Sequence, residues 1–262
     1  PEGGGGWSGL SFPACKSFLS GNHYLFVFSG RNPIQYRGQW IFKWNKDLLR
    51  RILYIAVPNG VESGFFQLVK VGLSSIVALF GTSQIAANGI AQSIWGVAAL
   101  VCVTMGPVFI TVIGQCMGAG DIPEAEKYFR KLMKITLVFS VAWNALVFVG
   151  TPILMTFYTL ADETKQLVVR LVLVHNIFNA AAFPYADPLG KGLRAAGDVK
   201  FTTLVSLGTT AGVRLVFSIL FGVVMNLGVM GIAWAMCLDW VLRGIIFRHR
   251  FKQGKWKTCK VI

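Results

Sequence analysis

The chain has 262 residues, of which 54% are hydrophobic and only 14% are charged. Soluble domains carry about 25% charged residues, so this composition excludes an ordinary soluble protein and indicates a membrane protein. The net charge of +14 would fit a nucleic-acid-binding protein. However, lysine and arginine cluster in short blocks between long apolar segments, as orientation signals of membrane proteins do. We therefore expect no nucleic-acid partner.

Residues 1–30 contain no recognisable element, and we interpret them as an irregular N-terminal remnant. The chain starts with Pro1 and has no signal-peptide layout, so we expect it to be a fragment. Gly6-Trp7-Ser8-Gly9 matches the Gly-x-Ser-Gly pattern of rhomboid-like intramembrane proteases. This match lies in a polar, Gly-rich tail rather than in a membrane helix, so chance explains it better.

Residues 31–51 mix six lysines and arginines with tryptophan, tyrosine and phenylalanine, which is typical of a segment at the lipid headgroup boundary. Six apolar segments follow, and each is long enough to cross about 30 Å of hydrocarbon as a helix. They predict an all-α, polytopic membrane domain over 52–247 and a basic tail over 248–262. The predicted spans are 52–80, 86–113, 133–158, 166–188, 201–225 and 228–247.

Positive charge lies mostly on one side of these spans. Four segments on that side hold 20 of the 25 lysine and arginine residues, namely 31–51, 114–134, 191–200 and 243–260. The loops on the other side, 81–85, 159–165 and 226–227, hold only Lys165. Positively charged loops stay on the cytoplasmic side of a membrane. Both ends of the domain are therefore expected in the cytoplasm.

The five cysteines give no sign of a disulfide framework or a metal site, because their number is odd and no Cys-x-x-Cys pair occurs. Most of them lie in or beside apolar segments, where a cysteine acts as a small inert residue. We expect no cofactor and no metal. The cysteines are Cys15, Cys102, Cys116, Cys237 and Cys259.

Two loops repeat one sequence pattern at the end of an apolar segment. The first reads Gly114-Gln115 and then Gly118-Ala119-Gly120-Asp121, and the second reads Leu193-Arg194-Ala195-Ala196-Gly197-Asp198. Together they resemble loops of the multidrug and toxic compound extrusion (MATE) transporters, closest to the DinF-like bacterial branch. The resemblance covers the chain from about residue 31 to its end.

This resemblance implies that the chain is the second half of a twelve-helix transporter in the bacterial inner membrane. The six predicted spans would form one lobe, and residues 31–51 would be the cytoplasmic linker between the two lobes. The missing N-terminal lobe would then be a necessary partner.

Glu62 is the first candidate for a functional ionisable residue. It lies near the middle of the first span, four residues after Pro58, and Phe66 and Lys70 follow on the same side of the helix. An ionisable side chain at this depth is costly and usually faces a cavity or the bundle interior. Glu62 is expected to exchange a proton or bind a cation. The alternative is a structural ion pair with a buried arginine or lysine.

The resemblance complicates this assignment, because the better-known MATE branch has its acidic residue where this chain has Phe66 and Gln67. Another acidic position of that branch corresponds to about Phe183. Neither acid is present here, and Gln67 remains as a polar candidate at the first position. Glu62 instead matches a Pro-Asn-Gly-x-Glu pattern of the DinF-like branch.

His175 and Asn179 form a polar strip on the fourth span. They are expected to hydrogen-bond to a neighbouring helix, and His175 has proton relay as an alternative role. Asp187 lies just before Pro188 near the cytoplasmic end of this span, so an exposed charge at a helix end is expected there.

Arg214 lies about thirteen residues into the fifth span, too deep to reach either surface easily. It needs an acidic partner, and Glu62 and Asp239 are the two candidates. Asp239 and Arg243 lie four residues apart on the last span, where a helix brings them together.

Large aromatic and methionine side chains near the span centres are candidates for lining a substrate site. They would hold flat, lipophilic cations by stacking and cation–π contact, whereas packing or lipid contact is the alternative for each. These candidates are Phe66, Trp95, Met105, Phe109 and Phe183.

The sequence and the resemblance together predict a secondary active exporter of lipophilic cationic drugs or toxic compounds, driven by a H⁺ or Na⁺ gradient through alternating access. We expect no enzyme activity. A lipid-linked oligosaccharide flippase of the same superfamily is the alternative, but it needs a more cationic cavity than Lys70 and Arg214 provide. A six-span intramembrane protease is less favoured, because His175 has no matching nucleophile in a span.

Overall fold

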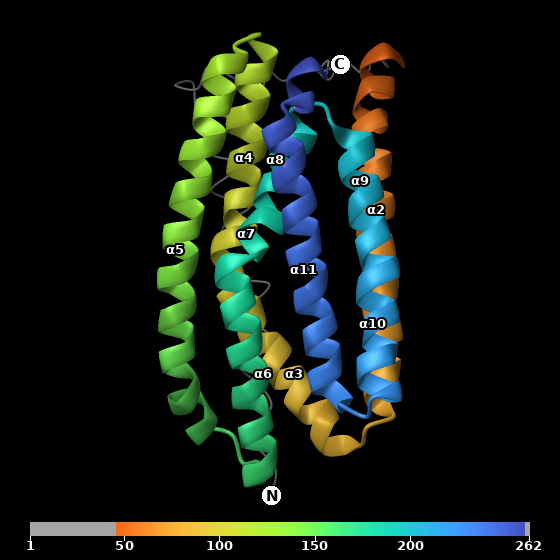
Figure 1. Cartoon of the computed structure of the whole chain (residues 1–262), viewed down its shortest axis with the longest axis vertical. Coiled ribbons are helices and arrows are strands. Elements are labelled where there is room, and N and C mark those ends of the chain that lie inside the picture. The colour runs from red at the N-terminus through yellow and green to blue at the C-terminus, as the bar shows by residue number, and fades with distance from the viewer. Residues whose placement is uncertain (1–45, 260–262) are drawn as a thin grey trace, which may run out of the picture. The chain divides into compact units, whose positions relative to one another are not determined.

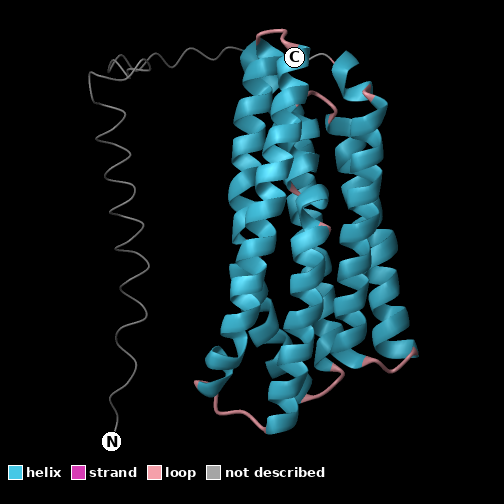
Figure 2. Ribbon diagram, turned by 60° about the vertical axis from the view of Figure 1, so that its left-hand side comes forward, coloured by secondary structure: helices cyan, strands magenta, loops and turns pink. Residues whose placement is uncertain are grey.

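The computed structural model describes residues 46–259, so the predicted N-terminal remnant and most of the predicted linker lie outside the described residues. The described residues form helices and no strand, and most loops lie at the two ends of the bundle, with short breaks midway along it (Figures 1 and 2). Five helices are long and apolar enough to cross a membrane, and one bent pair brings this number to six. The prediction of an all-α membrane domain is confirmed.

The elements follow one another with short connections. In chain order they are α2 (Lys46–Ala78), α3 (Thr82–Ala98), α4 (Leu100–Gly118), α5 (Ile122–Thr156), α6 (Asp162–Ala181), α7 (Phe183–Ala186), α8 (Pro188–Ala195), α9 (Val199–Gly208), the π-helix η1 (Thr209–Leu215), α10 (Val216–Ile219), the π-helix η2 (Leu220–Val224), α11 (Gly228–Gln253) and the 3₁₀-helix η3 (Lys255–Thr258).

Four of the predicted spans are interrupted or extended in the structure. The second span is divided at Ala99 into α3 and α4, and the fourth bends by 56° where α6 gives way to α7 and α8. The fifth span alternates between α-helix and π-helix. The third is one helix of 35 residues that begins at Ile122, so its charged start continues directly into the apolar part.

The two loops that share a sequence pattern contain Gly120-Asp121 and Gly197-Asp198, and we call them the Gly-Asp loops. Their glycines share one backbone conformation. Gly120 and Gly197 have φ values of 76° and 97°, a left-handed conformation that a glycine adopts without strain. Asp121 then caps α5 by accepting a hydrogen bond from the Glu124 backbone nitrogen at 3.0 Å. Asp198 makes no such cap and instead binds the Arg250 side chain at 2.7 and 3.1 Å.

Both loops lie at one end of the bundle, together with the end of α11, and we call this end the basic end. A hydrophobic cluster lies beneath it, with Phe109, Phe129 and Phe247 fully or almost fully buried. Trp256 of η3 is also fully buried and stacks on Phe251 at 5.7 Å. The predicted basic tail therefore begins as a continuation of α11, which extends to Gln253, and it packs against the bundle through Trp256.

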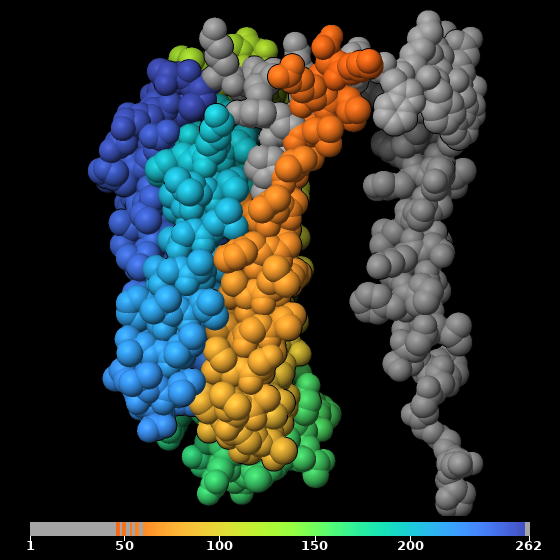
Figure 3. Space-filling view, turned by 90° about the vertical axis from the view of Figure 1, so that its right-hand side faces the viewer, coloured from red at the N-terminus to blue at the C-terminus, as the bar shows by residue number. Residues whose placement is uncertain are grey.

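Helix α2 lies alongside α9 and α10 (Figure 3). Its side chains are mostly exposed: of those that the structure describes, only Val69 and Val77 are buried. Val77 belongs to a second hydrophobic cluster, which also contains Ala91 of α3, Val168 of α6 and Ile232 of α11. Helix α2 is thus anchored in a hydrophobic cluster by its last turns.

Gly231 allows the closest approach between α11 and η2. A Cβ atom at this position would lie 2.5 Å from the Phe221 carbonyl carbon and 2.6 Å from the Gly222 nitrogen. Because backbone atoms cannot move aside easily, we expect Gly231→Ala to lower the free energy of unfolding by about 1–3 kcal/mol. Gly89→Ala is the control, since nothing lies within 4 Å of that position. The measurement is thermal unfolding of both variants in the same detergent. Equal unfolding midpoints for Gly231→Ala and Gly89→Ala would contradict this packing.

Candidate functional site

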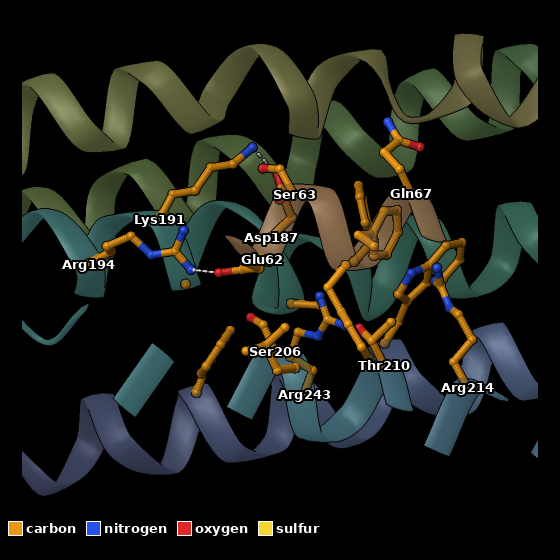
Figure 4. Close-up of a pocket in the computed structure, with 18 of the residues that line it drawn as sticks. Glu62, Ser63, Gln67, Asp187, Lys191, Arg194, Ser206, Thr210, Arg214 and Arg243 are labelled. Atoms are coloured by element: carbon orange, nitrogen blue, oxygen red, sulfur yellow. Dashed lines mark hydrogen bonds and ion pairs between the residues drawn. The ribbon is translucent and has the colours of Figure 1, made fainter. Parts of the chain in front are cut away.

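A cavity of about 320 Å³ opens between α2 and the helices that face it (Figure 4). Its lining combines charged, hydroxyl and aromatic side chains from seven elements. They are Glu62, Ser63, Phe65, Phe66 and Gln67 of α2, Trp95 of α3, Phe183 and Ala186 of α7, Asp187, Gly190, Lys191 and Arg194 at or in α8, Ser206 and Leu207 of α9, Thr210 and Arg214 of η1, and Trp240, Arg243 and Phe247 of α11.

Glu62 forms an ion pair across this cavity. Its Oε2 atom lies 2.5 Å from the Arg194 guanidinium, and the two side chains are 20% and 14% exposed. The pair joins α2 to α8 and is drawn as a dashed line in Figure 4. The structure therefore pairs Glu62 with Arg194 and not with Arg214. This agrees with the structural ion pair that the sequence left open, although a different arginine supplies it.

Arg214 finds its partner in Asp239, the other candidate that the sequence offered. Its Nε atom lies 3.3 Å from Asp239, and its guanidinium lies 4.9 Å from the centre of the Phe66 ring. Asp239 is fully buried and also accepts hydrogen bonds from Arg243 at 2.9 and 3.1 Å, as the spacing of four residues predicted. One buried carboxylate thus serves two guanidinium groups.

Arg243 has two further partners on η1. It donates hydrogen bonds to the Thr209 hydroxyl at 3.1 Å and to the Thr210 hydroxyl at 2.8 Å. A π-helix brings residues five apart onto one face, so Thr209 and Arg214 both face α11. The cluster therefore joins the fifth span to the last span through charge and hydrogen bonds.

Asp187 and Lys191 form a third ion pair at the cavity, with 2.8 Å between carboxylate and ammonium. The expectation that Asp187 is merely an exposed helix-end charge needs correction, because the bend before α8 turns this residue into the cavity lining. Four cationic side chains line the cavity against two carboxylates. Only Lys70 and Arg214 were expected near the middle of the spans, so the cavity is more cationic than the sequence predicted.

Aromatic rings form the apolar part of the lining. Trp95 and Trp240 stack at 5.8 Å, and Phe183 lies 5.1 Å from Trp240. Gln67 also lines the cavity, as does Phe66. The structure thus brings three of the predicted substrate-lining residues, Phe66, Trp95 and Phe183, to one cavity.

Met105 and Phe109 are not among the residues that line this cavity. Phe109 is fully buried in the hydrophobic cluster at the basic end, 6.1 Å from the Phe129 ring, and Met105 packs against the same cluster. Gly192 makes room for both rings, since a Cβ there would lie 2.5 Å from Phe129. Their position favours the packing alternative.

His175 and Asn179 also lie outside the lining. His175 is buried 6.2 Å from the Trp240 ring, and neither of its ring nitrogens has a hydrogen-bond partner among the described residues. Asn179 donates to the Asn144 side chain at 2.9 Å, which joins α6 to α5. Asn179 therefore has the interhelical hydrogen bond that the sequence predicted, whereas the same expectation was wrong for His175, which packs against Trp240 instead. Among the described residues, no group of acidic, histidine or cysteine side chains is suited to hold a metal.

Several cavity residues were missed or not chosen from the sequence, among them Asp187, Lys191, Arg194, Trp240 and Arg243. Arg194 lies beyond the predicted end of the fourth span, and a straight helix would place it at the surface. The break after α6 directs it back towards α2. Pro184 and Pro188 were the available signal, since a proline within a helix interrupts its hydrogen bonds. They did not give the direction of the bend.

Comparison with known proteins now identifies the family. The MatE family model matches residues 58–220 of this chain. The chain belongs to the MATE family. The transporter YisQ of Bacillus subtilis, whose function is uncharacterised, is 23% identical over 82% of this chain and 47% of its own length. The probable multidrug resistance protein YoeA of the same organism is 20% identical over 90% of this chain and 51% of its own length.

A solved structure confirms the fold. This chain superposes on a multidrug resistance MATE transporter in an outward-facing conformation with a TM-score of 0.79, at 15% identity, over 92% of this chain and 55% of that one. The chain spans about half the length of the relatives it matches. The resemblance to the DinF-like branch stays a prediction.

Asp239 offers a direct stability test. Asp239→Asn leaves Arg214 and Arg243 buried without a counter-charge, and we expect it to lower the free energy of unfolding by about 3–5 kcal/mol. Glu62→Gln should cost less, because Glu62 keeps some contact with solvent. Adding Arg214→Met to Asp239→Asn should recover part of the loss. Equal unfolding midpoints for Asp239→Asn and Glu62→Gln would contradict this assignment.

Proposed function

We propose that this chain is one six-helix lobe of a secondary active exporter of drug-like aromatic compounds, driven by a H⁺ or Na⁺ gradient. The observation that carries the proposal is the cavity of a MATE-family chain, in which aromatic rings, hydroxyl groups and ion pairs from seven elements meet. The names of relatives support the drug-like class, since YoeA is described as a probable multidrug resistance protein. The second lobe would complete the path.

The rings of Phe66, Trp95, Phe183 and Trp240 suit flat, lipophilic molecules. Lipophilic cations, which the sequence favoured, would bind these rings by cation–π contact. In the described lobe, however, each carboxylate at the cavity is paired with an arginine or a lysine. A cationic substrate would therefore displace a basic side chain or find its counter-charge in the other lobe.

The flippase alternative gains support from this charge distribution. Four cationic side chains line the cavity, and a lipid-linked oligosaccharide carries phosphate groups that such side chains bind. We keep this function as the second candidate, because the main argument against it was that the cavity would contain too few cationic side chains.

Coupling to an ion gradient would act through the Glu62–Arg194 pair. A proton or a Na⁺ ion at Glu62 would compete with the Arg194 guanidinium and loosen the contact between α2 and α8. A bent fourth span and a largely exposed α2 suit a lobe that changes shape during alternating access. We propose further that the basic end faces the cytoplasm, in a bacterial inner membrane, because it carries most of the lysine and arginine residues.

The test is efflux of a fluorescent lipophilic cation from drug-sensitive bacteria that express the chain with an N-terminal MATE lobe. Imposed H⁺ and Na⁺ gradients identify the coupling ion. A hydrogen bond between charged groups is worth about 1.5–3 kcal/mol, or tenfold and more in an equilibrium constant. We therefore expect Glu62→Gln to reduce gradient-driven efflux about tenfold. Glu163→Gln removes an exposed carboxylate in the first turn of α6 and should leave efflux unchanged.

Efflux that depends on a gradient but survives Glu62→Gln would retain the exporter and refute coupling at Glu62. No efflux under either gradient, from two lobes that copurify, would refute the exporter. Movement of a fluorescent polyprenyl-phosphate lipid across the membrane of vesicles reconstituted with the two lobes would then favour the flippase.

A further inference from the structure

A second cavity, of about 500 Å³, lies at the basic end between α5 and α11 and shares no lining residue with the first. We call it the basic groove. Its residues come from α5, from the short helices α7 and α8, and from α11 with its C-terminal turn. They are Glu126, Arg130, Met133, Lys134, Leu137, Tyr185, Leu189, Arg248, Phe251, Lys252, Gly254 and Lys257.

The rim of the basic groove carries five cationic side chains and one carboxylate. The carboxylate is Glu126, which is already bound by Arg130 and Lys257. Lys134 and Lys252 are exposed and have no ion-pair or hydrogen-bond partner within residues 46–259. A cluster of cations with two members left uncompensated attracts an anion.

The wall of the groove is apolar. Met133 and Leu189 are buried, and Leu137 and Phe251 are half-buried. The Tyr185 ring also lines the groove and lies 5.1 Å from the Arg248 guanidinium. A free phosphate ion would gain nothing from these groups, whereas an acyl chain next to a headgroup would cover them.

The groove lies at the level where the helix surface changes from charged to apolar. Directly after Lys134, the exposed residues of α5 are Ile135, Val138, Phe139 and Val141, and on α11 the exposed Ile245 precedes Arg248 by one turn. Such a boundary coincides with the lipid headgroup region. Basic pockets between membrane helices at this level bind anionic headgroups.

We propose that the basic groove is a binding site for an anionic phospholipid. The ammonium groups of Lys134 and Lys252 hold the headgroup phosphate, Arg248 adds a guanidinium at the rim, and an acyl chain runs along Leu137. An adjoining cavity, which contains Lys127 and Lys131 and also Arg130 and Lys134, extends the positive surface along α5. This inference depends only on the basic end and does not require the proposed transport function.

The experiment is native mass spectrometry of the purified chain in detergent, titrated separately with phosphatidylglycerol and with phosphatidylcholine of equal chain length. We expect phosphatidylglycerol to bind more tightly. Lys134→Gln with Lys252→Gln should weaken its binding about tenfold or more, since each basic residue near the headgroup contributes substantially. Lys200→Gln with Lys255→Gln removes the same charge at the same end but outside the groove and should retain binding.

A further pair, Lys134→Arg with Lys252→Arg, keeps the charge and should restore binding, which separates loss of the site from misfolding. A titration with inorganic phosphate distinguishes the two sources of the anion. Equal binding of the two lipids, an equal loss in the Lys200/Lys255 control pair, or displacement of the lipid by millimolar phosphate would each overturn the lipid site.

Discussion

Asp239 of α11 is fully buried, and it forms ion pairs with two arginines. Arg214 comes from η1 and Arg243 from α11 itself, so the carboxylate lies at the interface of these two helices. Two guanidinium groups around one carboxylate cannot separate in a membrane without leaving an uncompensated charge. Helix α11 and η1 are therefore fixed relative to each other. This contact also sets the position of the guanidinium groups of Arg214 and Arg243, which are two of the four cationic groups at the cavity.

Much of this architecture could be predicted from the sequence. The apolar segments and the distribution of lysine and arginine predicted the helices and the basic end. An apolar segment that crosses a membrane must satisfy its own backbone hydrogen bonds, and a helix does so. Asp239 and Arg243 were paired from their spacing, and Asp239 was one of two partners foreseen for Arg214. These predictions rest on local periodicity and on the cost of an unpaired buried charge.

The remaining part of the site depended on geometry that local patterns do not encode. The bend of 56° after α6 turns Asp187 and Arg194 into the cavity, and the proline pattern gave neither its size nor its direction. Phe109 could not be told apart from Phe66 by residue type, although one is buried in the hydrophobic cluster and the other lines the cavity. The α-to-π transition at Thr209 likewise has no clear sequence signature.

The two Gly-Asp loops show that one sequence pattern serves two structural ends. In the first loop Asp121 caps its own helix, and in the second Asp198 holds Arg250 of the last helix. The first loop is thus stabilised locally, and the second depends on a helix that follows some fifty residues later in the chain. The α8–α9 connection therefore gains this stabilisation only when α11 is in place.

Helix α2 leaves most of its described side chains exposed and is anchored in a hydrophobic cluster near its last turn. Its cavity half contacts the facing helices through the Glu62–Arg194 pair and the Phe66–Arg214 contact. Among the described side chains of α2, only Val69 and Val77 are buried, so tilting the helix about its anchored end would uncover few described apolar side chains. In mechanical terms α2 is a lever with an apolar pivot, and the Glu62–Arg194 pair and the Phe66–Arg214 contact hold its other part in place.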